Sequence, residues 1–414
     1  MTNIDRRTFT SSAITLLAAA GLGSGSAMAQ SSLTKPQPTR IAIPERELAD
    51  LKERLRSARW PVEVDPGQWT RGVPQDYMRR VVDYWANSFD WRAIEDQLNE
   101  YEQVNFEHEG QVLHAFHVRS ARPDAIPLVL IHGWPSSAVE YLKVIEPLTN
   151  PAVGRAFHLV IPSQPGFGLS PASSQVGWTS VKTAQAIAGL MADLGYERYA
   201  IHGSDMGADV AGQLDQISAG KVIGVHVATD TDTIVAVASF MGQDLSSNTV
   251  LNDDQKVRVG AKFAALPDDM GYIGIQSTRP KTLGYALHDS PIGQLAWIVE
   301  KFDAWTNPSK ALPEDAVDLD QLLTNVTLYW FGGGGAASAN AVYESMKAMS
   351  WAPPTDTPQG ASAFNADDLA RPLFDPEASL LFWREHAEGG HFPAMEEPEL
   401  LASDIRDFFT SLAG

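Results

Sequence analysis

The segment that decides the fold begins Tyr199-Ala200-Ile201-His202-Gly203-Ser204-Asp205-Met206-Gly207 and continues as a helical stretch from Ala208 to Ile217. A buried strand, a tight turn flanked by small residues and then a helix form the motif known as a nucleophile elbow. Its central residue, here Asp205, projects above the sheet. Gly203 and Gly207 are required on either side because the turn brings backbone segments too close for a Cβ atom.

An aspartate at the centre of the turn changes the class of reaction. Most elbows carry serine, which attacks an acyl carbon, whereas a carboxylate attacks a saturated carbon and becomes an alkyl ester. Ser204 is off-centre, so it should not point into the site. An ordinary turn aspartate in an α/β protein is the alternative that this motif alone leaves open.

The chain around this turn alternates between strands and helices, which predicts parallel βαβ units and a sheet buried on both faces. Helical stretches such as Val181 to Leu194 separate the apolar, β-rich runs. These runs are Val112 to Val118, Pro127 to Ile131, His158 to Ile161, Tyr199 to His202 and Val222 to Val227.

From about Asp230 to Ser350 the alternation gives way to helical segments such as Asp254 to Ala265 and Ile292 to Trp305. Strand character then returns, and the chain closes on an amphipathic helix. The returning strands are Gly360 to Phe364 and Leu380 to Phe382, and the closing helix is Glu399 to Leu412. A helical insertion inside a parallel sheet is the arrangement of a lid.

The expected fold is therefore the α/β-hydrolase fold, with a mostly parallel central sheet, flanking helices, a helical lid and an N-terminal meander. We assign residues 30–110 to an N-terminal region wrapping the core, 230–350 to the lid, and 111–229 and 351–414 to the two parts of the core.

The first 29 residues predict an export signal. Arg6 and Arg7 precede an apolar stretch from Ala13 to Leu22, and Ala27-Met28-Ala29 is a small-x-small cleavage site. The pattern favours twin-arginine export, although Asp5 before the arginines keeps a Sec signal as the alternative. The apolar stretch is shorter than the ~20 residues that span a bilayer. We expect an exported protein, periplasmic or secreted.

The N-terminal region begins with Leu33 to Thr39, a polar stretch with two prolines that predicts a linker. Pro44 then opens a helix in which Leu48, Leu51 and Leu55 form one apolar face. An aromatic-rich segment follows, which either anchors this region to a neighbouring core or covers the active site. Its members are Trp60, Trp69, Tyr77, Tyr84, Trp85, Phe89 and Trp91.

Composition restricts the partners. The chain has 414 residues, a net charge of -20 and no cysteine. Acidity argues against nucleic acid and anionic membranes, and the absence of cysteine excludes disulfides and thiolate metal sites. No motif gathers three metal ligands and no glycine-rich phosphate loop is present, so we expect no metal and no cofactor.

The strand ending at Ile131 is followed by His132-Gly133-Trp134-Pro135. In this fold, that turn supplies one backbone N–H to an oxyanion hole and the residue after the nucleophile supplies the other. We assign these donors to Trp134 and Met206, and interpret His132 as structural.

The general base is expected at His391, within Glu388-Gly389-Gly390-His391-Phe392. A histidine in a glycine-rich loop after the final strand, last in chain order, is where this fold places its base. The acid that orients it should follow a strand. We favour Asp367, with Asp368, Asp230 and Asp232 as alternatives.

Beyond these single motifs, much of the chain resembles the epoxide hydrolases of microsomal type, including their characteristic N-terminal region. The resemblance covers most of the mature chain. It rests on Ile41-Ala42-Ile43-Pro44, Ala58-Arg59-Trp60-Pro61, Phe89-Asp90-Trp91-Arg92, His132-Gly133-Trp134-Pro135, Pro165-Gly166-Phe167-Gly168, Gly203-Ser204-Asp205-Met206-Gly207, Asp289-Ser290-Pro291-Ile292-Gly293, Leu323-Thr324-Asn325-Val326 and Gly389-Gly390-His391-Phe392.

The resemblance implies Asp205 as nucleophile, His391 as base and an acid at Asp367, where the mammalian members carry glutamate. It also implies two lid tyrosines that hydrogen-bond the epoxide oxygen, at Tyr272 and Tyr343. Met206 departs from the group, which commonly has tryptophan there. An export signal replaces the membrane anchor of the mammalian enzymes.

The resulting expectation is hydrolysis of a small apolar epoxide to a vicinal diol. Two other functions stay open. A haloalkane dehalogenase uses the same aspartate and histidine but needs N–H donors for the departing halide in place of lid tyrosines. An inactive hydrolase fold would instead bind an apolar ligand or a partner protein.

Overall fold

The computed structural model describes residues 34–246, 248–349, 352–353 and 355–412. The export signal predicted at residues 1–29 lies outside the described residues. No helix in the described part of the chain is long and apolar enough to cross a bilayer.

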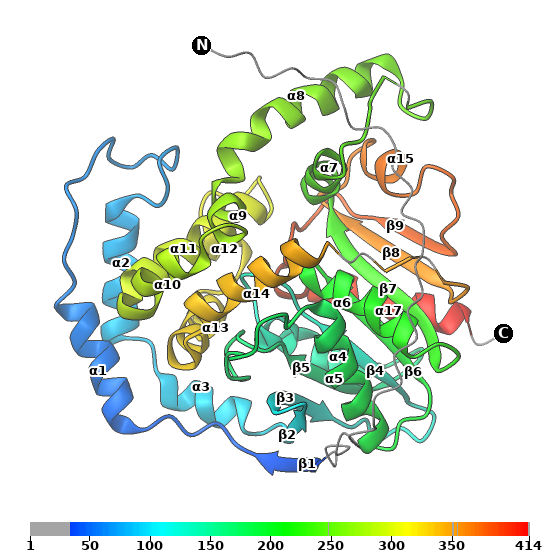
Figure 1. The fold of residues 1–414 in the computed structure, drawn as a ribbon, viewed down its shortest axis with the longest axis horizontal. Helices are drawn as coiled ribbons and strands as arrows, with labels where there is room; N and C mark the ends of the chain where they lie inside the picture. Colours follow the sequence, from blue (N-terminus) through cyan, green and yellow to red (C-terminus); the bar gives the residue numbers. More distant parts are fainter. Residues whose placement is uncertain (1–33, 247, 350–351, 354, 413–414) are drawn as a thin grey trace, which may run out of the picture. The chain divides into compact units, whose positions relative to one another are not determined.

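In these residues, nine strands form one sheet in the order β1-β2-β3-β5-β4-β6-β7-β8-β9 (Figure 1). The strands are β1 (Thr34–Thr39), β2 (Gln103–His108), β3 (Gln111–Val118), β4 (Ile126–Ile131), β5 (Phe157–Ser163), β6 (Tyr199–Ser204), β7 (Val222–Asp230), β8 (Gln359–Phe364) and β9 (Phe382–Glu385). The first three strands and the β3–β5 pair are antiparallel, and all pairs from β5 to β9 are parallel. This is the α/β-hydrolase fold, as the sequence predicts.

Helices cover both faces of the sheet, so alternate residues of one strand enter different cores. Leu128 and Leu130 of β4 pack into the core that holds α4 and α17, whereas Val129 and Ile131 pack into the core that holds α5 and α6. These flanking helices are η1 (Ala138–Val144, a 3₁₀ helix), α4 (Ile145–Thr149), α5 (Ser180–Asp193), α6 (Met206–Ile217), α15 (Ala370–Phe374), α16 (Pro393–Glu396) and α17 (Pro398–Ser411).

Between β7 and β8 the described chain is helical. This insertion contains α7 (Thr231–Phe240), α8 (Asp253–Asp269), α9 (Gly271–Gln276), α10 (Pro280–Asp289), α11 (Pro291–Trp305), α12 (Pro313–Ala316), α13 (Leu319–Gly332) and α14 (Gly334–Ala348). We call it the lid. Figure 1 shows α9 to α14 grouped together, with α8 extending away from that group.

The N-terminal region packs against the lid through α1 (Glu45–Arg56) and α2 (Gln75–Asn87), and α3 (Trp91–Leu98) follows them. Leu48, Leu51 and Leu55 are buried on α1, which confirms its predicted apolar face. Aromatic side chains of α2 hydrogen-bond to the lid: Trp85 Nε1 donates to Thr327 Oγ1 at 2.9 Å, and the Tyr77 hydroxyl donates to Glu314 at 2.8 Å. The aromatic-rich segment thus anchors this region to the lid.

The predicted linker at residues 33–39 is wrong for its described part, because Thr34–Thr39 forms β1 and pairs antiparallel with β2. Proline lacks an N–H and is tolerated in strands mainly at an edge, and β1 is the edge strand of this sheet. Residues 34–108 therefore contribute two strands to the sheet as well as the helices α1 and α2 that pack against the lid. Strand β9 also begins later than predicted, at Phe382.

Candidate active site

Asp205 lies at the sharp turn between β6 and α6, with φ 51° and ψ -128°. A Cβ at Gly203 would lie 2.4 Å from Gly207 O, and one at Gly207 would lie 2.0 Å from Ile131 O. The steric reason given for the two glycines is thereby confirmed. Positive φ at a non-glycine residue is uncommon and costs free energy, and here it accompanies a carboxylate turned above the end of the sheet.

The turn after β4 holds one oxygen of this carboxylate. The backbone N–H of Trp134 donates to Asp205 Oδ1 at 2.8 Å. A Cβ at Gly133 would lie 2.4 Å from that same oxygen, so only glycine allows this approach. Both predicted N–H donors act on the carboxylate: burial raises the pKa of Asp205, but His391 and the N–H groups of Met206 and Trp134 outweigh it and leave the pKa below its usual value.

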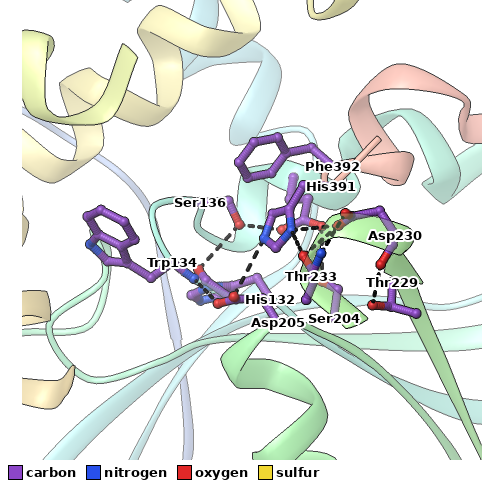
Figure 2. Close-up of polar contacts among 12 residues, drawn as sticks. His132, Trp134, Ser136, Ser204, Asp205, Thr229, Asp230, Thr233, His391 and Phe392 are labelled. Carbon is purple, nitrogen blue, oxygen red and sulfur yellow. Dashed lines mark hydrogen bonds and ion pairs between the residues drawn. The ribbon is translucent and has the colours of Figure 1, made fainter. Parts of the chain in front are cut away.

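His391 lies between two carboxylates (Figure 2). Its Nδ1 is 3.1 Å from Asp230 Oδ2, and its Nε2 is 3.5 Å from Asp205 Oδ2. The backbone N–H of His391 donates to Trp305 O at 2.8 Å, which fixes the loop. Burial lowers the pKa of His391, but the two carboxylates raise it further, to about 10. Asp205 and His391 are thus brought together as the sequence predicts.

The acid beside His391 is Asp230, and the predicted placement of Asp367 there is wrong. Asp230 is the last residue of β7 and caps α7, accepting from Thr233 N at 2.9 Å and from Thr233 Oγ1 at 2.6 Å. Thr233 Oγ1 also lies 2.9 Å from His391 Nδ1, so it can accept from the ring while donating to Asp230. Figure 2 shows this three-residue contact.

Asp367 points elsewhere because its side chain has other partners. It lies three residues beyond β8, is 42% exposed, pairs with Arg258 at 3.2 Å and accepts from Leu369 N at 2.9 Å. Asp368, the first alternative, also pairs with Arg258 and is 57% exposed. Asp232, the last alternative, pairs with Lys262 at the surface. Asp230, which the sequence leaves as an alternative, is the acid that contacts His391.

Tyr272, on α9, joins an aromatic wall beside the nucleophile. Its ring stacks on Trp134 with centroids 5.1 Å apart and meets Trp305 edge-on at 5.3 Å. Burial raises the pKa of the Tyr272 hydroxyl, and the Asp205 charge raises it further. Among the described residues this hydroxyl has no hydrogen-bond partner, so it is available to a substrate.

Tyr343 lies on α14, and the ammonium of Lys347 lies 5.5 Å from its ring centroid. No hydrogen bond or ring contact between described residues joins it to Asp205, His391 or Tyr272. The structure therefore brings one of the two implied tyrosines into the aromatic wall and does not bring the other.

Two lid residues that we did not single out hold the oxyanion turn. Asn325 of α13 donates to Pro135 O at 2.8 Å and accepts from Ser137 Oγ at 2.7 Å. One helical turn later, the Tyr329 hydroxyl donates to Ser136 O at 2.8 Å. Asn325 belongs to Leu323-Thr324-Asn325-Val326, one of the motifs on which the resemblance rests, and that motif was the signal in the sequence that could have identified it.

His132 is structural, as interpreted from the sequence. Its Nε2 accepts from Gln164 N at 3.1 Å and its Nδ1 lies 3.0 Å from Gly133 O. Burial lowers the pKa of His132 to about 4, so the ring is neutral at pH 7. No group of three or more His, Asp or Glu side chains among the described residues could hold a metal ion.

Comparison with known proteins places this site in a family. A model of the epoxide hydrolase N terminus matches residues 36–141, and a model of the alpha/beta hydrolase fold matches residues 126–219. Epoxide hydrolase 1 of Sus scrofa is 33% identical over 413 residues, covering 93% of this chain and 91% of that protein.

Solved structures agree. Juvenile hormone epoxide hydrolase from Bombyx mori has a TM-score of 0.76 and 27% identity, covering 92% of this chain and 94% of that one. Aspergillus niger epoxide hydrolase has a TM-score of 0.74 and 28% identity, covering 92% and 97%. With this likeness extending over nearly all of the described residues, the chain belongs to the epoxide hydrolase family, with its N-terminal region joined to an α/β-hydrolase fold.

Proposed function

We propose that this protein hydrolyses an apolar epoxide to a vicinal diol through an alkyl ester on Asp205. The observation that carries the proposal is the carboxylate at the elbow. Its Oδ1 accepts from the Trp134 N–H at 2.8 Å, while its Oδ2 lies 3.5 Å from His391 Nε2. A carboxylate held by one oxygen in an oxyanion hole has its second oxygen free to attack carbon.

In the first half-reaction, Oδ2 of Asp205 attacks one ring carbon from the side opposite the epoxide oxygen. The carbon–oxygen bond breaks, and the departing oxygen takes a proton from the Tyr272 hydroxyl, whose ring is fixed by stacking on Trp134. The apolar wall of Trp134, Tyr272 and Trp305 excludes water from the oxirane, and favours an apolar substrate. The His391 cation then returns a proton to the tyrosinate.

The second half-reaction uses the change in charge at Asp205. In the resting enzyme His391 is a cation, because two carboxylates raise its pKa to about 10. Esterification removes the Asp205 charge, so the pKa of His391 falls and the neutral ring can deprotonate water. Water attacks the ester carbonyl, the N–H groups of Trp134 and Met206 stabilise the oxyanion by ~2.7–4 kcal/mol per donor, and the diol leaves.

A single turnover in isotopically labelled water tests the covalent route. The first diol should carry one unlabelled oxygen from the Asp205 carboxylate in addition to the epoxide oxygen, and the label should enter Asp205. Label in the first diol would mean direct attack by water on the ring, and the ester route would be abandoned.

Asp230 and Asp367 give a matched pair of variants. Asp230→Asn should lower kcat by on the order of 10²–10⁴-fold, because His391 loses the partner that orients its ring and stabilises its cation. Asp367→Asn should stay within about threefold of wild type, since it disturbs a surface ion pair and an amide oxygen can still accept from Leu369 N. Steady-state rates and thermal midpoints should be measured on both. The reverse ranking would return the acid role to Asp367.

The two tyrosines separate this proposal from a dehalogenase. Tyr272→Phe should slow ester formation by on the order of 10²-fold, because general acid assistance is lost. Tyr343→Phe, made in parallel, measures independently how much the second tyrosine contributes to the rate of ester formation. A haloalkane substrate serves as the control, since its halide needs no proton. Unchanged epoxide turnover in Tyr272→Phe would remove that residue from the mechanism.

We also propose that residues 1–29 direct export by the twin-arginine route, on the basis of Arg6, Arg7 and the Ala27-Met28-Ala29 site. Fractionation of a bacterial host should recover a processed protein outside the cytoplasm. Replacement of both arginines by lysine should leave the precursor inside. Continued export of that variant would favour the Sec route.

A further inference from the structure

Glu140 is a buried carboxylate that the mechanism above does not use. Glu140 lies on η1, which follows the oxyanion turn, and it is 2% exposed. Its Oε2 accepts a hydrogen bond from Ser136 Oγ, and its Oε1 accepts one from Ser204 Oγ at 3.2 Å. One carboxylate therefore joins Ser136 and Ser204, which are 68 residues apart in sequence.

These two serines mark the two halves of the oxyanion hole. Ser136 lies two residues after Trp134, and Ser204 lies two residues before Met206. Figure 2 shows both serines beside Asp205 and His391. Fixing the two serines relative to each other thus fixes the two N–H donors relative to each other.

Neighbouring contacts make the bridge rigid. Ser136 Oγ is also 3.3 Å from Gly133 O, and the Tyr141 hydroxyl donates to Ile131 O at 3.0 Å while lying 3.4 Å from Ser204 Oγ. The Glu140 carboxylate also interacts electrostatically with Asp205 and His391 of the site. Burial and the Asp205 charge raise the pKa of Glu140, whereas Ser136, His391 and Ser204 lower it, and the resulting pKa is about 7.

We propose that Glu140 is a positioning residue of the oxyanion hole, holding the Trp134 and Met206 donors in register through Ser136 and Ser204. The inference rests on the proposed function. Its consequence is selective, because an oxyanion forms only when the ester is hydrolysed and not when the epoxide is opened. Loss of the bridge should slow the second half-reaction far more than the first.

Rapid mixing of enzyme with excess aryl epoxide, followed by acid quench and mass measurement of the intact chain, gives both rates. In Glu140→Ala, ester decay should slow by at least about tenfold, while ester formation stays within about threefold of wild type. Glu140→Gln should recover most of the decay rate, because an amide can accept from one serine and donate to the other. A residue with only a packing role would not change the ratio of the two rates.

Glu95→Ala is the matched control. Glu95 is likewise a buried bridging carboxylate, accepting from Ile43 N at 2.7 Å and from Trp91 Nε1 at 3.2 Å, but it lies in the N-terminal region. It should lower the thermal midpoint without changing the ratio of ester decay to ester formation.

If Glu140→Ala does not fold, Ser136→Ala and Ser204→Ala each remove one arm of the bridge and should slow ester decay in the same direction. Equal slowing of both half-reactions, or an unchanged ratio in folded variants, would overturn the inference while leaving the proposed function intact. Failure of the wild-type enzyme to form any ester would overturn both.

Discussion

Asp205→Ala is expected to lower kcat/KM for an apolar aryl epoxide by on the order of 10⁴-fold or more, because no other group can form the covalent ester. Ser204 cannot substitute, since it is buried and hydrogen-bonded to Glu140. The mass of the intact chain after mixing with substrate should show no adduct. Product formation over hours, followed by chromatography, measures the residual rate.

Asp232→Ala is the control for this change. Its carboxylate is 62% exposed and pairs with Lys262 at the surface, so activity should stay near that of wild type. Thermal midpoints of both variants show whether the fold survives, because a change at a residue with φ 51° also affects backbone strain. Equal turnover by Asp205→Ala and wild type in well-folded samples would refute the proposed site.

His391→Gln is expected to trap the enzyme as the ester. Ring opening needs Asp205 and Tyr272, so one equivalent of adduct should form rapidly, after which hydrolysis should be slower by on the order of 10²–10⁴-fold. The resting enzyme also loses a cation beside Asp205. Since that cation lowers the pKa of Asp205, the acid limb of ester formation should move to higher pH.

Quenched samples at increasing times should show a stoichiometric burst followed by a slow phase. The pH dependence of the burst rate measures the pKa of the Asp205 carboxyl directly. In the wild type, the neutral form of His391 should appear only after esterification, because both carboxylates raise its resting pKa. A variant that hydrolyses its ester at the wild-type rate would show that another group activates water.

Local sterics are what the sequence alone determined. In the Gly203-Ser204-Asp205-Met206-Gly207 turn, a Cβ atom at Gly203 or Gly207 would lie 2.4 Å or 2.0 Å from a backbone oxygen. The glycines in the sequence therefore reveal the geometry of the turn. Gly390 before His391 is similar, since its Cβ would lie 2.6 Å from Trp305 O. Periodicity likewise identified β3 to β9 and helices such as α1, α5 and α17, because burial of alternate or every third and fourth residue depends on short-range spacing.

Contacts between distant segments were decided only by the tertiary structure. Asp230 and His391 are 161 residues apart, and several acids end strands, so residue type could not rank them. Asp367 was favoured, yet its carboxylate is held by Arg258 from the lid. The pairing of Thr34–Thr39 with β2 and the bridge made by Glu140 depend in the same way on where other elements lie. Backbone sterics act over a few residues and leave a signature in the chain, whereas the partner of a side chain depends on where strands far apart in sequence end in space.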